Sequence, residues 1–191
     1  RRQDIKRGDV MKRLKFVRYD NRKHFDKLFQ YMTDSGEQMM FLTYTPSNSV
    51  KDFERWLDDQ LKYFYNEFFV VEDKDELIGF VYSYEHHERD GHCKIGVYIA
   101  PKWRIGGIGA IAGLQIMQYI FLHYPMRRIN CDVYEYNKPS LDSLLNCGFK
   151  KMGAWKEYRF HNGTYYDLIL LSMTRKAYMD KYERYFKDFK D

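Results

Sequence analysis

One stretch of the chain, from Ile95 to Tyr124, constrains the fold more than any other. It opens with a short β-branched run, passes through a turn that holds Gly106, Gly107 and Gly109, and continues as an apolar segment. Short β-branched runs are typical of buried strands, and long runs of helix-forming residues are typical of helices. The stretch therefore predicts a strand, a glycine-rich turn and a helix, whose first N–H groups and positive end attract an anion.

Composition limits the size of the fold and the class of partner. A length of 191 residues suits one domain, and an apolar share of 45% predicts a sizeable core. The formal net charge is +5, and the densest basic patch runs from Arg1 to Lys15. No basic stripe with interleaved aromatic residues is visible, so no nucleic-acid partner is predicted. The small positive excess suits an anionic ligand.

Cysteine usage and hydropathy indicate the compartment. The chain has three cysteines, Cys93, Cys131 and Cys147, which is an odd number without a C-x-x-C pair. Neither a disulfide framework nor a zinc site is predicted, and we expect a reduced, cytoplasmic protein. No uncharged apolar run approaches about 18 residues and no signal peptide is visible, so no membrane segment is expected.

Hydrophobic periodicity predicts hairpins around a single strand–helix–strand crossover. The predicted strands cover residues 14–19, 68–72, 77–84, 94–100, 128–136, 149–160 and 164–174. The predicted helices cover residues 22–32, 50–65, 109–124 and the segment between Asn137 and Gly148. We predict an α+β fold with one mixed sheet. The expected domain spans residues 14–174, between a basic N-terminal tail over residues 1–13 and a charged C-terminal helix over residues 175–191.

The glycine turn has two interpretations, and the first is a dinucleotide site. Residues 107–112 fit the G-x-G-x-x-A fingerprint, and Asp132 lies near the distance expected for a ribose-binding acid. A dinucleotide domain repeats its strand–helix–strand unit, however, whereas this chain has one such crossover. Asp132 also falls inside a predicted strand instead of at its end. An NAD-binding protein therefore remains only a remote alternative.

The second interpretation begins at Arg104, because residues 104–109 fit the pattern R/Q-x-x-G-x-G/A. The neighbouring segments follow in a characteristic order: the strand of residues 95–99 before the turn, then Asn137 with Ser140, then the pair at residues 148–149. Together these segments resemble the GNAT family, the Gcn5-related N-acetyltransferases. The resemblance covers residues 14–174 and is greatest to the branch that acetylates ribosomal protein N-termini, with its amino-sugar, antibiotic and polyamine relatives.

This resemblance implies a GNAT fold that moves the acetyl group of acetyl-CoA to a primary amine, by direct transfer in a ternary complex. The amine would belong to a protein N-terminus, an amino sugar, a polyamine or an antibiotic. Two diverging strands would hold the pantetheine arm, and the turn would hold the pyrophosphate. The residues that the resemblance assigns to the cofactor are Val97, Tyr98, Ile99, Arg104, Ile105, Gly106, Gly107, Ile108, Gly109, Ala110, Asn137 and Ser140. Helix capping explains the last two equally well.

The catalytic residues depart from the family pattern. The family often carries a glutamate early in its fourth strand and a tyrosine seven residues after the asparagine, and these places hold Lys94 and Leu144. The general base is therefore unassigned among Glu85, His86 and Glu135, all of which are predicted near strand ends. The same departures motivate an alternative function, an acyl-CoA-binding module of this fold that has lost its chemistry.

The acceptor pocket is expected from the first two helices, residues 33–49 and the last hairpin. Its aromatic candidates are Tyr31, Phe41, Tyr44, Trp155 and Tyr158. No metal is predicted, because adjacent histidines on a turn, such as His86 and His87 with nearby His92, rarely make a complete site. An exposed edge strand near the last hairpin would support a homodimer.

Overall fold

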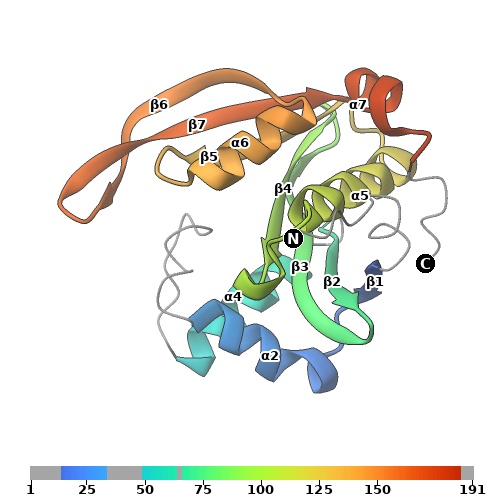
Figure 1. Ribbon diagram of the computed structural model, residues 1–191, viewed down its shortest axis with the longest axis vertical. Helices are drawn as coiled ribbons and strands as arrows, with labels where there is room; N and C mark the ends of the chain where they lie inside the picture. The colour runs from blue at the N-terminus through green and yellow to red at the C-terminus, as the bar shows by residue number, and fades with distance from the viewer. Residues whose placement is uncertain (1–13, 34–48, 64–65, 186–191) are drawn as a thin grey trace, which may run out of the picture. The chain divides into compact units, whose positions relative to one another are not determined.

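The chain folds into a mixed sheet with helices, as a computed structural model shows for residues 14–33, 49–63 and 66–185 (Figure 1). The elements, in chain order, are β1 (Leu14–Arg18), α2 (Asn21–Thr33), α4 (Val50–Lys62), β2 (Phe68–Asp73), β3 (Glu76–His87), β4 (His92–Ile99), η1 (Pro101–Trp103), α5 (Ile108–His123), β5 (Arg128–Tyr134), α6 (Lys138–Cys147), β6 (Lys150–His161), β7 (Thr164–Thr174) and α7 (Arg175–Tyr182). The sheet order is β1-β2-β3-β4-β5-β7-β6. The predicted α+β class with one mixed sheet is confirmed.

The single crossover lies where the sequence predicts it. Strands β4 and β5 are parallel and are joined through α5, whereas β1 with β2, β2 with β3, β5 with β7 and β6 with β7 are antiparallel. The β4–β5 register runs from His92↔Arg128 to Lys94↔Asn130. Both strands continue beyond this paired segment, to Ile99 and Tyr134.

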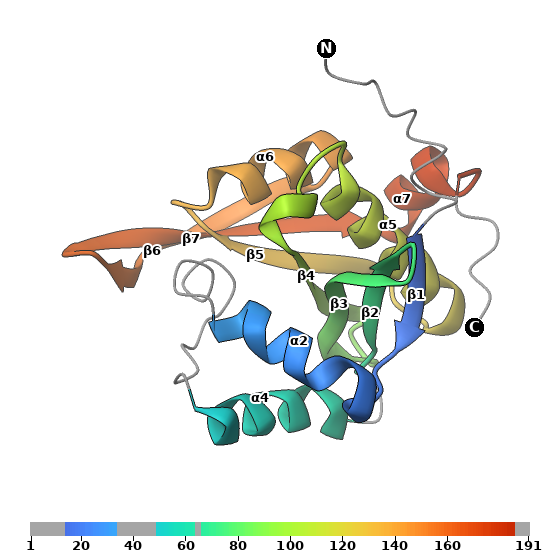
Figure 2. The same cartoon turned by 60° about the horizontal axis from the view of Figure 1, so that its bottom comes forward.

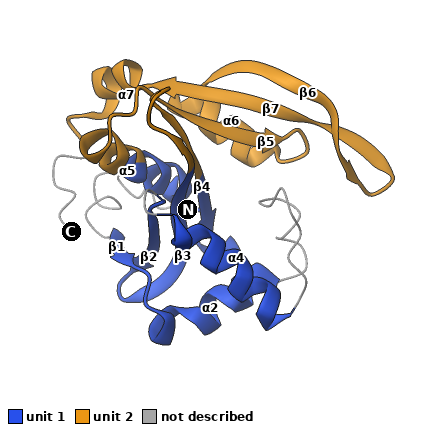
Figure 3. Cartoon of the chain, turned by 180° about the vertical axis from the view of Figure 1, so that it is seen from behind, with its two compact units in different colours: residues 1–84, 96–116, 191 blue, residues 85–95, 117–190 orange. Residues whose placement is uncertain are grey.

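The chain divides into two compact units, coloured separately in Figure 3. Unit 1 holds residues 1–84, 96–116 and 191, and unit 2 holds residues 85–95 and 117–190. In unit 1, α2 and α4 lie side by side (Figure 2). Ser49 caps α4 by accepting a hydrogen bond from the Asp52 N–H, and apolar residues at helical spacing face the core. The buried aromatic residues of this core include Phe53, Trp56, Phe68, Phe80 and Tyr98.

Unit 2 is built on the antiparallel ladder of β5, β7 and β6. The β5–β7 register runs from Arg128↔Thr174 to Tyr134↔Leu168, and the inward side chains of both strands are buried. Helix α6 ends at Gly148, whose φ of 102° is a left-handed conformation that favours glycine. The Tyr178 ring of α7 packs 5.3 Å from the Phe121 ring of α5. Strand β6 ends the sheet order and is an edge strand, and the predicted homodimer stays a prediction.

Several boundaries differ from the sequence prediction, and two of them carry candidate catalytic residues. Strand β3 extends through Glu85, His86 and His87, which the sequence places in a charged turn. Pairing with neighbouring strands carries the strand beyond its apolar part, because backbone hydrogen bonds do not require apolar side chains. Strand β5 ends at Tyr134, so Glu135 lies in the turn that follows it. None of the described helices is long and apolar enough to cross a membrane.

Candidate active site

The glycine turn between η1 and α5 is set by backbone conformation. Gly106 and Gly107 have φ values of 62° and 78°, in a region that residues with a Cβ rarely adopt. A Cβ built on either residue meets no other atom within 4 Å. The glycines are therefore required by their φ angles and not by a lack of space. The open side of this turn gives a ligand access to the backbone.

Helix α5 begins directly after these glycines. The Ile108 N–H bonds to the Ile105 carbonyl at 3.3 Å, and the Ile111 N–H bonds to the Gly107 carbonyl at 3.0 Å. The first turn of a helix leaves N–H groups without intrahelical partners and carries the positive end of the helix dipole. A glycine turn that leads into such a helix is suited to an anion with several oxygen atoms, such as a pyrophosphate.

Arg104 ties the turn to the end of β4. Its Nε donates a hydrogen bond to the Ile99 carbonyl at 2.6 Å, and its guanidinium carbon lies 5.6 Å from the centre of the Tyr98 ring. Tyr98 and Ile99 are buried, with exposed fractions of 2% and 4%. Because these side chains belong to the core of unit 1, any ligand at the end of β4 would contact the backbone. The resemblance to the GNAT family assigns the backbone of residues 97–99 to the cofactor, and that assignment stays a prediction.

In unit 2, Asn137 begins α6 as its N-cap. Its side-chain oxygen accepts a hydrogen bond from the Ser140 N–H at 3.3 Å, and the residue is 8% exposed. Pro139 lies in the first turn, where its missing N–H has no cost. Capping is therefore the role that the described contacts show for Asn137 and Ser140. Their contact with a cofactor stays a prediction.

Lys94 lies between two carboxylates. Its Nζ is 2.7 Å from Glu85 and 2.8 Å from Asp132, and the three side chains are 24%, 51% and 15% exposed. Burial lowers the pKa of Lys94, but the hydrogen bonds and charges of Asp132 and Glu85 outweigh it, so the pKa is raised. Sequence reasoning missed this cluster. Its one visible signal is a lysine and an aspartate inside two neighbouring apolar strands.

The three candidate bases lie in separate contact networks. Glu85 pairs with Lys94, as described above. The half-buried ring of His86 packs edge-on against Tyr124, with 5.5 Å between ring centres. Glu135 follows β5, and its backbone N–H bonds to the Asp167 carbonyl at 2.9 Å. The described contacts thus place Glu85 beside another charged side chain, and His86 beside an aromatic ring.

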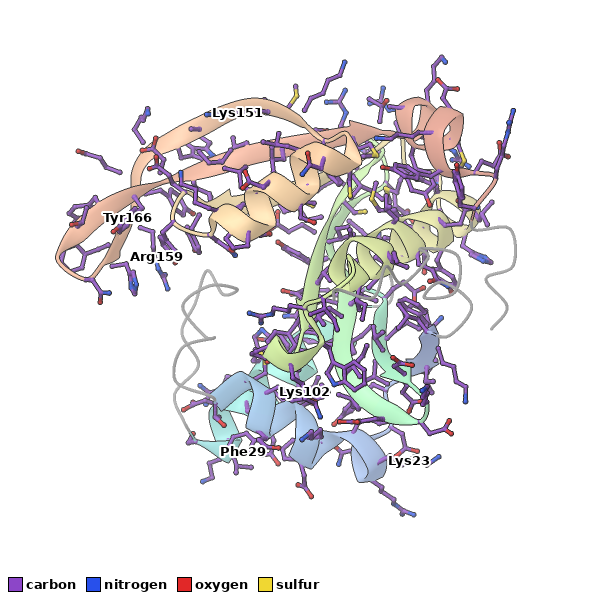
Figure 4. All side chains as sticks on the ribbon, in the orientation of Figure 1. Lys23, Phe29, Lys102, Lys151, Arg159 and Tyr166 are labelled. Carbon is purple, nitrogen blue, oxygen red and sulfur yellow. The ribbon has the colours of Figure 1, made fainter. Side chains whose placement is uncertain are left out.

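A cluster of aromatic rings at the end of β5 was not predicted. The Tyr136 ring lies 5.1 Å from both His161 and Tyr166, and the Arg159 guanidinium lies 5.4 Å from the Tyr134 ring. Figure 4 labels Arg159 and Tyr166 on the β6–β7 hairpin. Burial raises the pKa of Tyr134, which keeps its hydroxyl protonated at neutral pH. The residues come from three strands and from the turn after β5, so no local sequence motif predicts the cluster.

One aromatic candidate for the acceptor pocket lies in the core of unit 1. Tyr31 is 9% exposed and belongs to the core of unit 1, where its hydroxyl donates to the Leu77 carbonyl at 2.9 Å. Its position on the buried face of α2 explains this placement. Trp155 and Tyr158 are exposed on β6. The remaining candidates, Phe41 and Tyr44, lie outside the described residues.

Comparison with known proteins decides the family. A family model described as an acetyltransferase (GNAT) domain matches residues 13–150. The chain belongs to the GNAT acetyltransferase family. It is accordingly an N-acetyltransferase, as the sequence predicts. Membership in this family and the single crossover together contradict the dinucleotide alternative. The alternative of a module without chemistry is likewise replaced by an enzyme of the GNAT family.

The relatives of this GNAT protein differ in the share of the chain that they cover. The SPbeta prophage-derived uncharacterized N-acetyltransferase YokL of Bacillus subtilis is 27% identical over 132 residues, which are 68% of this chain and 73% of that protein. The ribosomal protein uS5-alanine N-acetyltransferase of Escherichia coli is 30% identical over 104 residues, 53% of each chain. The spermidine N-acetyltransferase of Vibrio cholerae, solved with CoA and spermine, superposes with a TM-score of 0.79 at 21% identity, covering 88% of this chain and 99% of that one. This last likeness shows the shared fold.

Proposed function

We propose that this GNAT protein transfers the acetyl group of acetyl-CoA to a primary amine. The observation that carries the proposal is the glycine turn at the start of α5, with two left-handed glycines and an arginine that ties it to β4. Backbone N–H groups of residues 105–110 would hold the pyrophosphate of the donor. The relative from Vibrio cholerae, which was solved with CoA, supports this choice of donor.

The proposed reaction is a direct transfer within a ternary complex. The free amine attacks the thioester carbon, a C–N bond forms, and the tetrahedral intermediate collapses with cleavage of the C–S bond. The attacking nitrogen loses a proton, and the departing thiolate of CoA gains one. A backbone N–H near Ile99 is proposed to polarise the thioester carbonyl, because oxyanion stabilisation is commonly a large part of acyl-transfer catalysis.

Among the three candidate bases, we favour Glu85. Lys94 occupies the place where the family often has its glutamate, and its Nζ holds the Glu85 carboxylate 2.7 Å away. A carboxylate is thus present beside that place although the residue itself has changed. The side chain of Glu85 is 51% exposed, so water reaches it and can relay the proton from the amine. His86 and Glu135 remain the alternatives.

The proposed acceptor is a small primary amine or a peptide N-terminus. The names of the relatives specify an alanine N-terminus in one case and spermidine in another. The decisive experiment is a thermal melt of the full chain with acetyl-CoA, CoA and NAD(H), followed by an acceptor screen. The screen should contain an alanine-terminated peptide, spermidine, an amino sugar and an aminoglycoside. We expect acetyl-CoA and CoA, but not NAD(H), to raise the Tm, and at least one amine to release CoA. A Tm that responds only to NAD(H) would contradict the proposal.

A further inference from the structure

The turn between β3 and β4 gathers three side chains that bind metals. One ligand atom from each of His87, Asp90 and His92 lies within 4.8 Å of the other two. The two imidazole rings are 4.6 Å apart, centre to centre. His86 is not part of this set, because successive side chains of a strand point to opposite faces. Asp90 supplies a ligand that sequence reasoning did not consider.

The backbone that carries these three residues is held in place from both sides. The Gly91 N–H bonds to the His87 carbonyl at 2.7 Å, which closes the turn. Arg127, the residue before β5, donates its Nη2 to the Asp90 carbonyl at 2.7 Å and its backbone N–H to the Gly91 carbonyl at 2.6 Å. A ligand set on such a fixed turn loses less conformational entropy when it binds an ion.

The donor atoms favour one class of ion. Two imidazole nitrogens and one carboxylate oxygen suit Zn²⁺ and the neighbouring divalent transition metals, whereas Mg²⁺ and Ca²⁺ prefer oxygen ligands alone. Around a tetrahedral ion with bonds of about 2.0–2.2 Å, ligand atoms lie roughly 3.3 Å apart. The present spacing is therefore within reach of small rotamer changes. All three side chains are exposed or half-buried, so an ion has direct access from solvent.

We propose that His87, Asp90 and His92 form a binding site for a divalent transition-metal ion such as Zn²⁺. The ion joins the last residue of β3 to the first residue of β4 and stabilises the folded hairpin. Three protein ligands leave one coordination position for water. The site is independent of the acetyl-CoA proposal, since its residues lie outside the glycine turn and outside the Lys94 cluster.

Titration of the full, metal-free chain with ZnCl₂ by calorimetry tests the proposal. We expect one ion per chain, and an affinity that falls at least about tenfold in His87→Ala and in His92→Ala. His123→Ala is the matched control, because His123 is another exposed histidine and lies at the end of α5. Its affinity for Zn²⁺ should equal that of the unmodified chain. The three cysteines are buried and do not compete for the ion.

A second readout is independent of calorimetry. Excess ZnCl₂ should raise the Tm of the unmodified chain by about 5 °C or more, and MgCl₂ should leave it unchanged. Asp90→Asn lies in the exposed turn and keeps the side-chain volume, so it tests the third ligand should a histidine variant fail to fold. It should weaken Zn²⁺ binding while the circular dichroism spectrum stays the same. Absence of saturable binding at about 1 mM Zn²⁺, or equal affinity in all four variants, would overturn the proposal.

Discussion

The glycine turn and the Lys94 cluster are organised in opposite ways. The turn occupies consecutive residues, and its form follows from the φ angles of Gly106 and Gly107. The cluster joins side chains from three strands, with Lys94 between Glu85 and Asp132. The first is set by local backbone conformation and the second by pairing between strands distant in sequence. Substitutions should therefore act on ligand binding in the turn, and on catalysis and stability in the cluster.

The largest effect is expected for Gly107→Glu. The substitution places a carboxylate at the proposed pyrophosphate site and a Cβ at a φ of 78°. We expect the Kd for CoA to rise by at least about 100-fold, measured by calorimetry. Gly163→Glu is the matched control, because Gly163 has a φ of 79° and likewise no atom near its added Cβ. It carries the same backbone strain and should keep its affinity for CoA. Equal affinities for CoA in the two variants would contradict binding of the donor at the glycine turn.

The next effect concerns the chemical step. Glu85→Gln removes the proposed base while keeping the shape of the side chain, and should lower kcat by about 10²-fold or more with little change in the Kd for CoA. Glu135→Gln is its control and should keep kcat within about threefold. Steady-state rates of CoA release measure both. The reverse pattern, with Glu135→Gln inactive and Glu85→Gln active, would assign the base to the turn after β5.

Stability should respond to Lys94→Met. This change leaves Asp132 without its ammonium partner, at a cost of about 1–3 kcal/mol in the free energy of unfolding, measured by urea denaturation. The pKa of Lys94 is raised in the folded state, so the stabilisation is present below about pH 10.5 and is lost as the pH rises through the folded value. The difference between the two proteins should thus be constant from about pH 7 to 9 and shrink above about pH 10.5.

A double substitution tests whether Lys94 and Asp132 stabilise the protein as a pair. Lys94→Met with Asp132→Asn removes both charges and should recover part of the lost stability, because an unpaired, half-buried charge costs more than a missing pair. If the double variant loses as much free energy of unfolding as the two single variants together, Lys94 and Asp132 are not energetically coupled.

The smallest effect is expected at Arg104. Arg104→Ala removes the hydrogen bond to the Ile99 carbonyl, and one such bond contributes about 1 kcal/mol. The Kd for CoA should rise roughly fivefold. Lys102→Ala is a control on the same segment, since Lys102 pairs with Glu76. It should bind CoA as the unmodified chain does. A change of less than twofold in Arg104→Ala would mean that the turn keeps its conformation without this tie.

The features that the sequence predicts are those set by residues close together in the chain. The strand, turn and helix around Gly107 follow from residues next to one another, and so do the Asn137 cap and the turn at Asn162. The extension of β3 through His87 depends on pairing with other strands, so periodicity places these residues in a turn instead. Tyr31 has the residue type of a pocket residue, and its burial depends on the core packed against α2. The Lys94 cluster could be predicted only from the order of the strands in the sheet, and local sequence patterns do not give that order.

The most direct test of the proposed acetyl transfer combines the donor, the acceptor and the glycine turn in one assay. Release of CoA from acetyl-CoA is followed with each amine of the panel, and the product is identified by mass spectrometry. We expect an acetylated amine and one CoA per product with the unmodified chain, and none with Gly107→Glu. Equal turnover in Gly107→Glu, or CoA release without any acetylated amine in a folded protein, would contradict the proposed transfer.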